Sequence, residues 1–167
     1  MNQANNQSYD SFDIGYFQSP LGVIEICCSN NYIERVAFLD QPVTIQTKES
    51  PLVKSCQRQL DEYFSNKRQQ FDLPLALKGT SFQQSVWEIL QTIPFGTTST
   101  YGTIAQKLNK PQASRAVGMA NHHNPVVIIV PCHRVIGANG KLVGYGGGLM
   151  RKEWLLRHEM NARFIHG

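Results

Sequence analysis

A cysteine followed by two basic side chains is the most chemically suggestive feature of this sequence. Cys132 comes after the apolar run 126–130, and His133 and Arg134 follow it directly. A thiol attacks as its thiolate, and a neighbouring imidazole or guanidinium group favours that form by lowering the thiol pKa. Because a lone cysteine is more often a buried structural residue, the local chemistry leaves a nucleophilic and a structural role open.

The residues able to assist this cysteine are few. Adjacent residues of an extended segment point to opposite sides, so His133 could reach the Cys132 sulfur through a water, through a local turn or directly. A histidine that acts as a base also needs a carboxylate to orient its second nitrogen. In the second half of the chain the candidates are Glu88, Glu153 and Glu159.

The other three cysteines suggest no chemistry of their own. Cys27 and Cys28 are adjacent, Cys56 stands apart, and none belongs to a CxxC pair, which makes a poor disulfide framework. A zinc ion would need three or four ligands at workable spacing, and the histidines are far from these cysteines in the sequence. We therefore expect buried structural thiols and a reducing compartment.

Composition limits the class of protein. The chain has 167 residues, enough for one domain or two small ones, and 41% of them are hydrophobic and 17% charged, as in ordinary globular proteins. The longest apolar run, 126–130, is far shorter than the about 20 residues of a membrane-spanning helix, so no membrane association is expected. Residues 1–13 are polar and lack the features of a signal peptide, which predicts a frayed tail and a cytoplasmic protein.

Charge is uneven along the chain. Residues 1–79 carry a net charge of −2, whereas residues 80–167 carry +6 and all five histidines. Such asymmetry suggests that the second half meets a polyanion such as nucleic acid. A moderately basic surface without a partner is the alternative, and charge alone favours neither.

The elements that must hold these residues change character half-way along the chain. In the first half, the patterns predict a hairpin over 16–27, a strand over 32–39, a helix over 52–64 and a short strand over 71–77. Two domains follow from this change, an N-terminal one at 1–79 and a C-terminal one at 80–167.

The second half is expected to be mainly helical. Ser81 is a good N-cap for a first helix, and the segments 101–108 and 112–121 form a helix-turn-helix pattern. The apolar run 126–130 is typical of a buried strand or extended segment, and a last helix is predicted over 149–159. Cys132 would therefore follow extended chain at the edge of a helical domain.

The second helix of the helix-turn-helix is rich in small residues. A helix that reads the major groove normally offers several Arg, Lys, Asn or Gln side chains, but 112–121 offers mainly small residues and one arginine, Arg115. Small side chains let a backbone approach a narrow groove closely, and a single arginine could act as a wedge or plug. Tight packing inside the protein is the alternative, and different faces of the helix could serve both.

Several short motifs resemble those of the methylated-DNA–protein-cysteine methyltransferases, also called O6-alkylguanine-DNA alkyltransferases. They are PCHRV at 131–135, RAVG at 115–118, NP at 124–125, FQQSVW at 82–87, IPFG at 93–96, GYGGGL at 144–149 and KEWLLRHE at 152–159. The likeness extends from SPLG at 19–22 to Glu159, and PCHRV in this setting is far more specific than an isolated Cys-His pair.

The resemblance implies a role for each candidate residue. Cys132 would accept the alkyl group, His133 would take the thiol proton through a water, and Glu159 would orient His133. Tyr101 would donate to the guanine ring, and Arg115 would fill the space left by a flipped nucleotide. The remaining candidates are Ala113, Ser114 and Gly118 for DNA contact, Asn124 as a hinge, and Val135, Tyr145 and Gly146 for the base pocket.

The resemblance also implies the fold, the reaction and the partner. The fold is mixed α/β (α+β), with a small ribonuclease-H-like sheet-plus-helix domain before a mainly helical domain that contains the helix-turn-helix. The reaction is DNA repair by a single, irreversible transfer of an alkyl group from O6-alkylguanine, or O4-alkylthymine, to Cys132 after base flipping. The partner is double-stranded DNA, bound through its minor groove by a monomer without strong sequence preference, and no cofactor is implied.

The residues also bear on a structural zinc and on two other classes of protein. Some family members hold a structural zinc in the N-terminal domain, but Ser29 and Glu34 do not fit as ligands, so no metal is expected. A protein that binds alkyl lesions without repairing them would lack the acceptor cysteine, which is present here. A cysteine hydrolase would share the Cys-His-Glu set, but it would need an oxyanion hole and would turn over many times.

Overall fold

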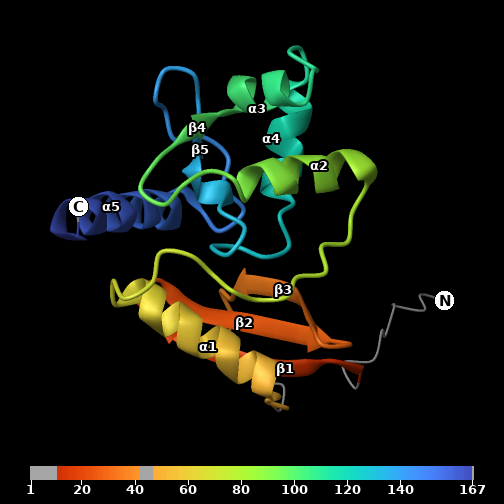
Figure 1. The fold of residues 1–167 in the computed structure, drawn as a ribbon, viewed down its shortest axis with the longest axis vertical. Helices are drawn as coiled ribbons and strands as arrows, with labels where there is room; N and C mark the ends of the chain where they lie inside the picture. The colour runs from red at the N-terminus through yellow and green to blue at the C-terminus, as the bar shows by residue number, and fades with distance from the viewer. Residues whose placement is uncertain (1–10, 42–46, 167) are drawn as a thin grey trace.

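The computed structural model describes residues 11–41 and 47–166 of the chain. Figure 1 shows a small sheet with one long helix on one side of the molecule and a group of helices on the other. The prediction of a tail through residue 13 is wrong at its end, because Asp13 opens the first strand and pairs with Cys28. The rest of that prediction, residues 1–10, lies outside the described residues.

The sheet of the N-terminal part is a three-stranded antiparallel meander. Its strands are β1 (Asp13–Ser19), β2 (Gly22–Ser29) and β3 (Tyr32–Phe38), in the order β1-β2-β3. Asn30 and Asn31 both have positive φ angles, 51° and 65°, as the favoured two-residue hairpin turn requires. The predicted hairpin and the strand after it are therefore both present.

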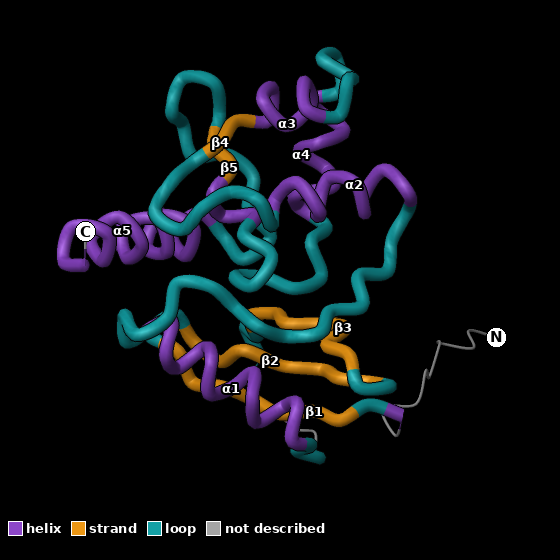
Figure 2. The backbone as a smooth tube through the Cα atoms, viewed as in Figure 1, coloured by secondary structure: helices purple, strands orange, loops and turns teal. Residues whose placement is uncertain are grey.

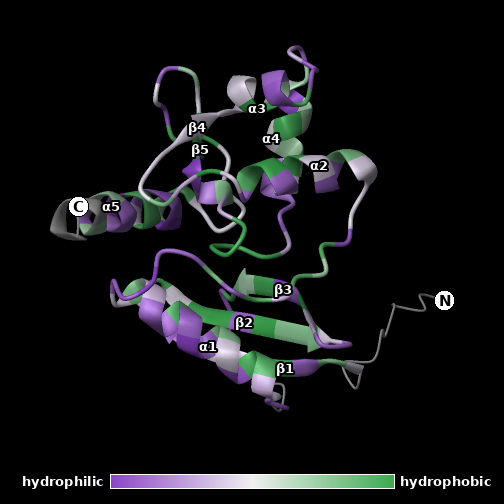
Figure 3. Ribbon diagram, in the orientation of Figure 1, coloured by the Kyte–Doolittle hydropathy of each residue, from purple (hydrophilic) through white to green (hydrophobic). Residues whose placement is uncertain are grey.

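Helix α1 (Pro51–Phe64) covers one face of this sheet and confirms the predicted helix. The Ser50 side chain accepts a hydrogen bond from the Val53 amide and caps the helix, and Pro51 occupies its first turn, where no amide donor is needed. In Figure 3 polar residues line the side of α1 that faces away from the strands. Gly15 on β1 lets the helix approach closely, because a Cβ there would overlap Val53.

The C-terminal part consists mainly of helices and loops, as Figure 2 shows. Its elements are α2 (Ser81–Leu90), β4 (Ser99–Thr100), α3 (Tyr101–Lys107), α4 (Ser114–His122), the short 3-10 helix η2 (Cys132–Arg134), β5 (Val135–Ile136) and α5 (Leu149–His166). The N-cap of α2 is Thr80 rather than the predicted Ser81, since Thr80 forms a reciprocal capping box with Gln83. Helix α5 also extends beyond the predicted end at residue 159.

The strand predicted over 71–77 and the strand or extended segment predicted over 126–130 are absent from the described residues. Within 71–77, only Leu75 pairs, forming an isolated parallel bridge with Ile33. The run 126–130 has the composition of a buried strand, but it folds as turns, and Ile128 takes a φ of 70°. Left-handed backbone is unfavourable for a β-branched residue, so the sequence pattern predicted extended backbone here instead of a turn.

The two parts share one buried core. Val36 of β3 forms a parallel bridge with Val126, and the side chains of the sheet, of α1 and of the helical part belong to one apolar cluster. This architecture confirms the predicted mixed fold, with a small sheet-plus-helix part and a mainly helical part. Among the described residues no helix is both long and apolar enough to cross a membrane.

Candidate active site

The turn before Cys132 sets the position of its thiol. Asn124 follows α4, its Nδ2 donates to the Val130 carbonyl oxygen at 2.8 Å, and its Oδ1 accepts from the Val126 amide at 3.0 Å. The same Nδ2 lies 3.0 Å from Cys132 Sγ. Asn124 therefore holds both ends of the turn and contacts the sulfur, so it links the end of α4 to the thiol.

The Cys132 thiol is protonated in the resting protein. Only 2% of the residue is exposed, and this burial raises the pKa of its thiol to about 11, although the Asn124 hydrogen bond and the Lys152 ammonium group act in the opposite direction. The prediction that the Arg134 guanidinium group lowers the pKa of this thiol is wrong, because that group faces Glu159 instead. Cys132 therefore needs a base to become a nucleophile.

His133 is fully buried and faces a carboxylate of α5. Its Nε2 lies 2.7 Å from Glu159 Oε1. An ionised carboxylate only accepts hydrogen bonds, so Nε2 carries a proton, and in the neutral form of the ring the lone pair is then on Nδ1. Its Nδ1 has no hydrogen-bond partner within the described part of the chain. The lone pair on Nδ1 is thus available to receive a proton.

Glu159 accepts hydrogen bonds from four groups. Arg134 donates through Nε and Nη2 at 2.9 Å each, Tyr63 Oη donates at 2.9 Å, the Gly96 amide donates at 3.3 Å, and His133 completes the set. Burial alone would raise the pKa of Glu159, but the hydrogen bonds of His133 and Arg134 and the charge of the Arg134 guanidinium group outweigh it and hold the pKa well below its ordinary value. The carboxylate is therefore ionised in the folded protein.

The loop that follows β5 also borders the cavity at the thiol and is held by two side chains of the helical part. Tyr101, the first residue of α3, donates through Oη to the Val143 carbonyl oxygen at 2.8 Å. Lys152 Nζ donates to that same oxygen at 3.0 Å and also to the Val135 carbonyl oxygen. Lys152 is fully buried, and burial lowers the pKa of its amine to about 8 despite the attraction of Cys132.

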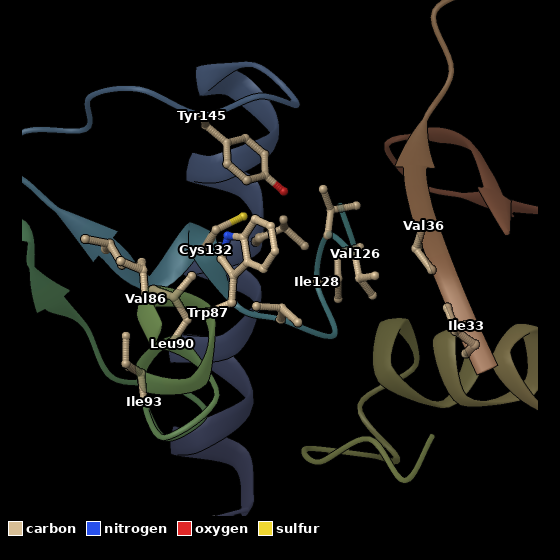
Figure 4. Packing of buried hydrophobic residues seen from close by; sticks show 14 of the residues in the cluster. Ile33, Val36, Val86, Trp87, Leu90, Ile93, Val126, Ile128, Cys132 and Tyr145 are labelled. Atoms are coloured by element: carbon tan, nitrogen blue, oxygen red, sulfur yellow. The ribbon is translucent and has the colours of Figure 1, made fainter. Parts of the chain in front are cut away.

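A cavity of about 440 Å³ opens onto Cys132 between this loop and β3. In Figure 4 the Cys132 sulfur lies close to the Tyr145 ring, which borders the cavity. Gly146 and Gly147 leave little room for a side chain. A Cβ on Gly146 would lie 3.1 Å from the His122 carbonyl oxygen, and a Cβ on Gly147 would lie 2.7 Å from the Tyr145 ring. The Tyr145 hydroxyl is buried and has no hydrogen-bond partner among the described residues.

Comparison with known protein families identifies the chain. One family model, the ribonuclease-like domain of 6-O-methylguanine DNA methyltransferase, matches residues 14–77. A second model, the DNA binding domain of the same protein, matches residues 81–161. The chain belongs to the 6-O-methylguanine DNA methyltransferase family.

Relatives that match most of the chain agree with this assignment. A methylated-DNA–protein-cysteine methyltransferase of Methanosarcina acetivorans is 47% identical over 148 residues, covering 86% of this chain and 95% of the relative. The crystal structure of Mycobacterium tuberculosis O6-methylguanine methyltransferase is 42% identical with a TM-score of 0.83, covering 90% of this chain and 94% of that one. The M. tuberculosis protein in complex with DNA is 44% identical with a TM-score of 0.80, covering 88% and 92%.

The helix-turn-helix of this methyltransferase adjoins the cavity through His122, the last residue of α4. A Cβ on Gly118 of α4 would lie 3.9 Å from the Tyr101 ring, so α4 packs against the start of α3 at this point. Arg115 is exposed on the same helix, and Ala113 and Ser114 are half-buried at its start. The residues predicted to contact DNA therefore lie together in the first half of α4.

The structure brings most of the other predicted residues of the methyltransferase together around Cys132. These are Tyr101, Asn124, His133, Val135, Tyr145, Gly146 and Glu159.

Three side chains that contribute to the site are not among the residues predicted from the sequence. They are Tyr63, Asn121 and Lys152. Asn121 Nδ2 lies 3.3 Å from the Cys132 carbonyl oxygen. Tyr63 follows the buried face of α1 three residues after Leu60, and that spacing could have shown that its side chain is buried. No pattern indicates that Lys152, in a charged motif, would be buried.

Proposed function

We propose that this protein repairs alkylated DNA by transferring the alkyl group of an O6-alkylguanine to its own Cys132. One observation carries the proposal: the thiol borders a cavity, and the next residue, His133, pairs with a buried carboxylate. The volume of about 440 Å³ is within the range of sites for small molecules, about 300–1,000 Å³. The curated relatives are named as methyltransferases of this reaction type, which supports the same chemistry here.

The proton of the thiol leaves first. A water between Cys132 Sγ and His133 Nδ1 carries it to the imidazole, and the buried Glu159 carboxylate stabilises the imidazolium that forms. Because the resting thiol is neutral, this relay supplies the thiolate when a substrate fills the cavity.

The thiolate then attacks the alkyl carbon of the lesion. A bond forms between that carbon and Sγ of Cys132, while the bond between the carbon and the guanine O6 breaks and leaves its electron pair on the base. Tyr101 donates a hydrogen bond to the base as it gains charge, and one proton returns to the guanine to complete the exchange. The product is a thioether, which this site offers no group to cleave, so each molecule acts once.

The lesion must leave the base stack to reach Cys132. Helix α4 approaches the minor groove with the small residues Ala113, Ser114 and Gly118, and the exposed Arg115 enters the space left by the flipped nucleotide. Contacts outside the pocket are mainly to phosphates, so binding has little sequence preference and weakens with salt. A flipped O4-alkylthymine presents its alkyl carbon to the same thiol.

The working state is a monomer in the cytoplasm. All four cysteines are free and buried in the structure, which suits a reducing compartment. The two domains predicted at 1–79 and 80–167 have different roles. The second holds the thiol, and the first supports it.

Intact-protein mass spectrometry tests the proposal directly. The protein is mixed with a duplex that carries one O6-methylguanine, and the expected result is a gain of one methyl group per molecule, mapped by peptide analysis to Cys132. The matched control is Cys132→Ser, which should bind the duplex and gain no mass. Salt-sensitive binding of the wild-type protein without mass gain would indicate a lesion-binding protein, and no binding at all would favour a cysteine hydrolase.

A further inference from the structure

One side chain of the sheet-plus-helix part reaches the carboxylate behind the thiol. Tyr63 lies in the last turn of α1, is fully buried, and donates through Oη to Glu159 Oε1 at 2.9 Å. Oε1 is also the atom that lies 2.7 Å from His133 Nε2. The two residues joined by this hydrogen bond are 96 positions apart, so the contact depends on how the two parts of the molecule pack.

The Tyr63 ring is fixed on several sides. Phe71 and Phe95 lie 5.6 and 6.1 Å from it between ring centroids, and the ring of His158 on α5 lies at 5.2 Å. His158 Nε2 also lies 2.9 Å from the Tyr63 backbone oxygen. With the ring held in this way, the hydroxyl has one position, and that position is beside Glu159.

Oε1 of Glu159 has competing partners. Arg134 approaches it with Nη2 at 2.9 Å and Nε at 3.3 Å, while His133 and Tyr63 approach from other directions. Without the Tyr63 donor, the carboxylate can turn further toward the guanidinium group, which is the charged partner. That movement would lengthen the contact with His133 Nε2 and loosen the hold on its ring.

We propose that Tyr63 is a positioning residue for alkyl transfer: its hydroxyl fixes Glu159 Oε1, and Glu159 thereby keeps the His133 proton on Nε2 and the Nδ1 lone pair toward the thiol. This inference rests on the proposed function. It gives the N-terminal part a direct share in the chemistry, because the donor belongs to α1 while the base and the nucleophile belong to the C-terminal part.

Tyr63→Phe tests the proposal, because it removes the hydroxyl and keeps the ring. The single-turnover rate of methyl transfer from an O6-methylguanine duplex is expected to fall about tenfold, with the affinity for the duplex unchanged. In a Glu159→Gln background, the same substitution should cause no further loss, since its effect passes through that carboxylate. Nitrogen-15 NMR of His133 should show a single tautomer in the wild-type protein and a mixture in Tyr63→Phe.

Ser50→Ala is the matched control for stability. It removes the N-cap of the same helix far from Glu159, so we expect a lower Tm and an unchanged transfer rate. A fluorotyrosine at position 63, which keeps the hydroxyl, should retain the wild-type rate and provides a second test if the phenylalanine variant folds poorly.

The outcomes separate this inference from the proposed function. A wild-type protein that gains no methyl group contradicts the function itself. Methyl transfer by the wild type with an equal rate in Tyr63→Phe, or with an equal loss in Ser50→Ala, shows that Tyr63 does not position Glu159 for transfer.

Discussion

The two sides of the Cys132 thiol are built differently. On the carboxylate side, formed by Tyr63, His133, Arg134 and Glu159, every residue is at most 6% exposed, and Glu159 accepts from four groups. The loop side is formed by Tyr101, residues 143–147, Arg151 and Lys152. On this side Val143 and Gly146 are exposed, and the Tyr101 hydroxyl donates a hydrogen bond to the Val143 carbonyl oxygen. There the Tyr145 hydroxyl has no partner among the described residues.

This difference fits the roles proposed for the two sides. Proton transfer gains from groups already oriented before the substrate arrives, because no reorganisation is then needed during the reaction. A site for a flipped base instead needs hydrogen bonds that can be exchanged, and the bond from Tyr101 to Val143 is of that kind. Substitutions that break a hydrogen bond should therefore affect rate and stability together on the carboxylate side, and mainly rate on the loop side.

Glu159→Gln should have the largest effect. It leaves the buried Arg134 charge without its counter-ion, so the free energy of unfolding should fall by about 3–5 kcal/mol. It also removes the group that stabilises the imidazolium of His133, so the transfer rate should fall about 10³-fold. Thermal unfolding and single-turnover kinetics measure the two effects, and a folded variant with near wild-type rate would remove Glu159 from the mechanism.

The pH dependence of stability provides a check on the same residue. The pKa of Glu159 is lower in the folded protein than its ordinary value of 4.5. Its stabilising contribution is therefore complete above that ordinary value and is lost as the pH falls below it toward the folded-state pKa. The Tm of the wild type should fall more steeply between about pH 5 and about pH 3 than the Tm of Glu159→Gln; parallel curves would mean that Glu159 is not the group responsible.

Tyr101→Phe should have the next largest effect, and on rate alone. Its hydroxyl is proposed to donate to the leaving guanine, and loss of one such donor lowers rates by about 10²-fold. The hydrogen bond it loses in the resting protein is to an exposed loop carbonyl, so the free energy of unfolding should change by less than about 1 kcal/mol. Tyr32→Phe, which alters an exposed tyrosine of β3, is the control and should match the wild type.

Arg151 should have a smaller effect, through the position of the loop. Its Nη1 donates to the Gly147 carbonyl oxygen at 3.0 Å, its Nε donates to the Leu21 carbonyl oxygen at 3.1 Å, and its Nη2 pairs with Asp40 at 2.9 Å. The guanidinium group also lies 4.5 Å from the Phe38 ring centroid, so it ties the loop to the sheet.

Arg151→Met keeps the aliphatic stem and removes these bonds. The transfer rate should fall about fivefold, because a less ordered loop presents the base less accurately. Arg157→Met on the same helix breaks only a surface pair with Glu153 and should leave the rate unchanged. Equal rates for both variants would mean that the sheet does not help to hold the loop.

Much of the fold and site could be predicted from the sequence, and the exceptions have physical reasons. The helix at α1 and the hairpin follow from local periodicity and turn residues, and Cys132, His133 and Glu159 lie in motifs. The run 126–130 misled because its β-branched residues favour a strand, whereas Asn124 bonds both ends of the segment and supports the left-handed turn at Ile128.

Contacts between distant segments gave no sequence signal. Arg134 was expected to act on the neighbouring thiol, but it bonds Glu159 on α5 and the Ile93 carbonyl oxygen instead. The spacing of Tyr63 from Leu60 could have shown that Tyr63 is buried, but not that its hydroxyl meets Glu159, and no pattern indicates that Lys152 is buried. The sequence therefore indicates the proposed reacting groups better than the groups that hold them in place.

Tyr145→Phe should have the smallest effect on rate and gives the sharpest comparison of the two sides. The ring of Tyr145 borders the cavity, whereas its hydroxyl is buried without a partner in the described residues. A buried hydroxyl without a hydrogen bond costs about 1–3 kcal/mol, so its removal should raise the Tm by a few degrees and change the transfer rate less than about threefold. Tyr63→Phe removes a partnered hydroxyl and should lower the Tm. Thermal unfolding of the two variants side by side measures both signs, and a lower Tm for both would show that the Tyr145 hydroxyl is satisfied in solution and that the loop side is as fully bonded as the carboxylate side.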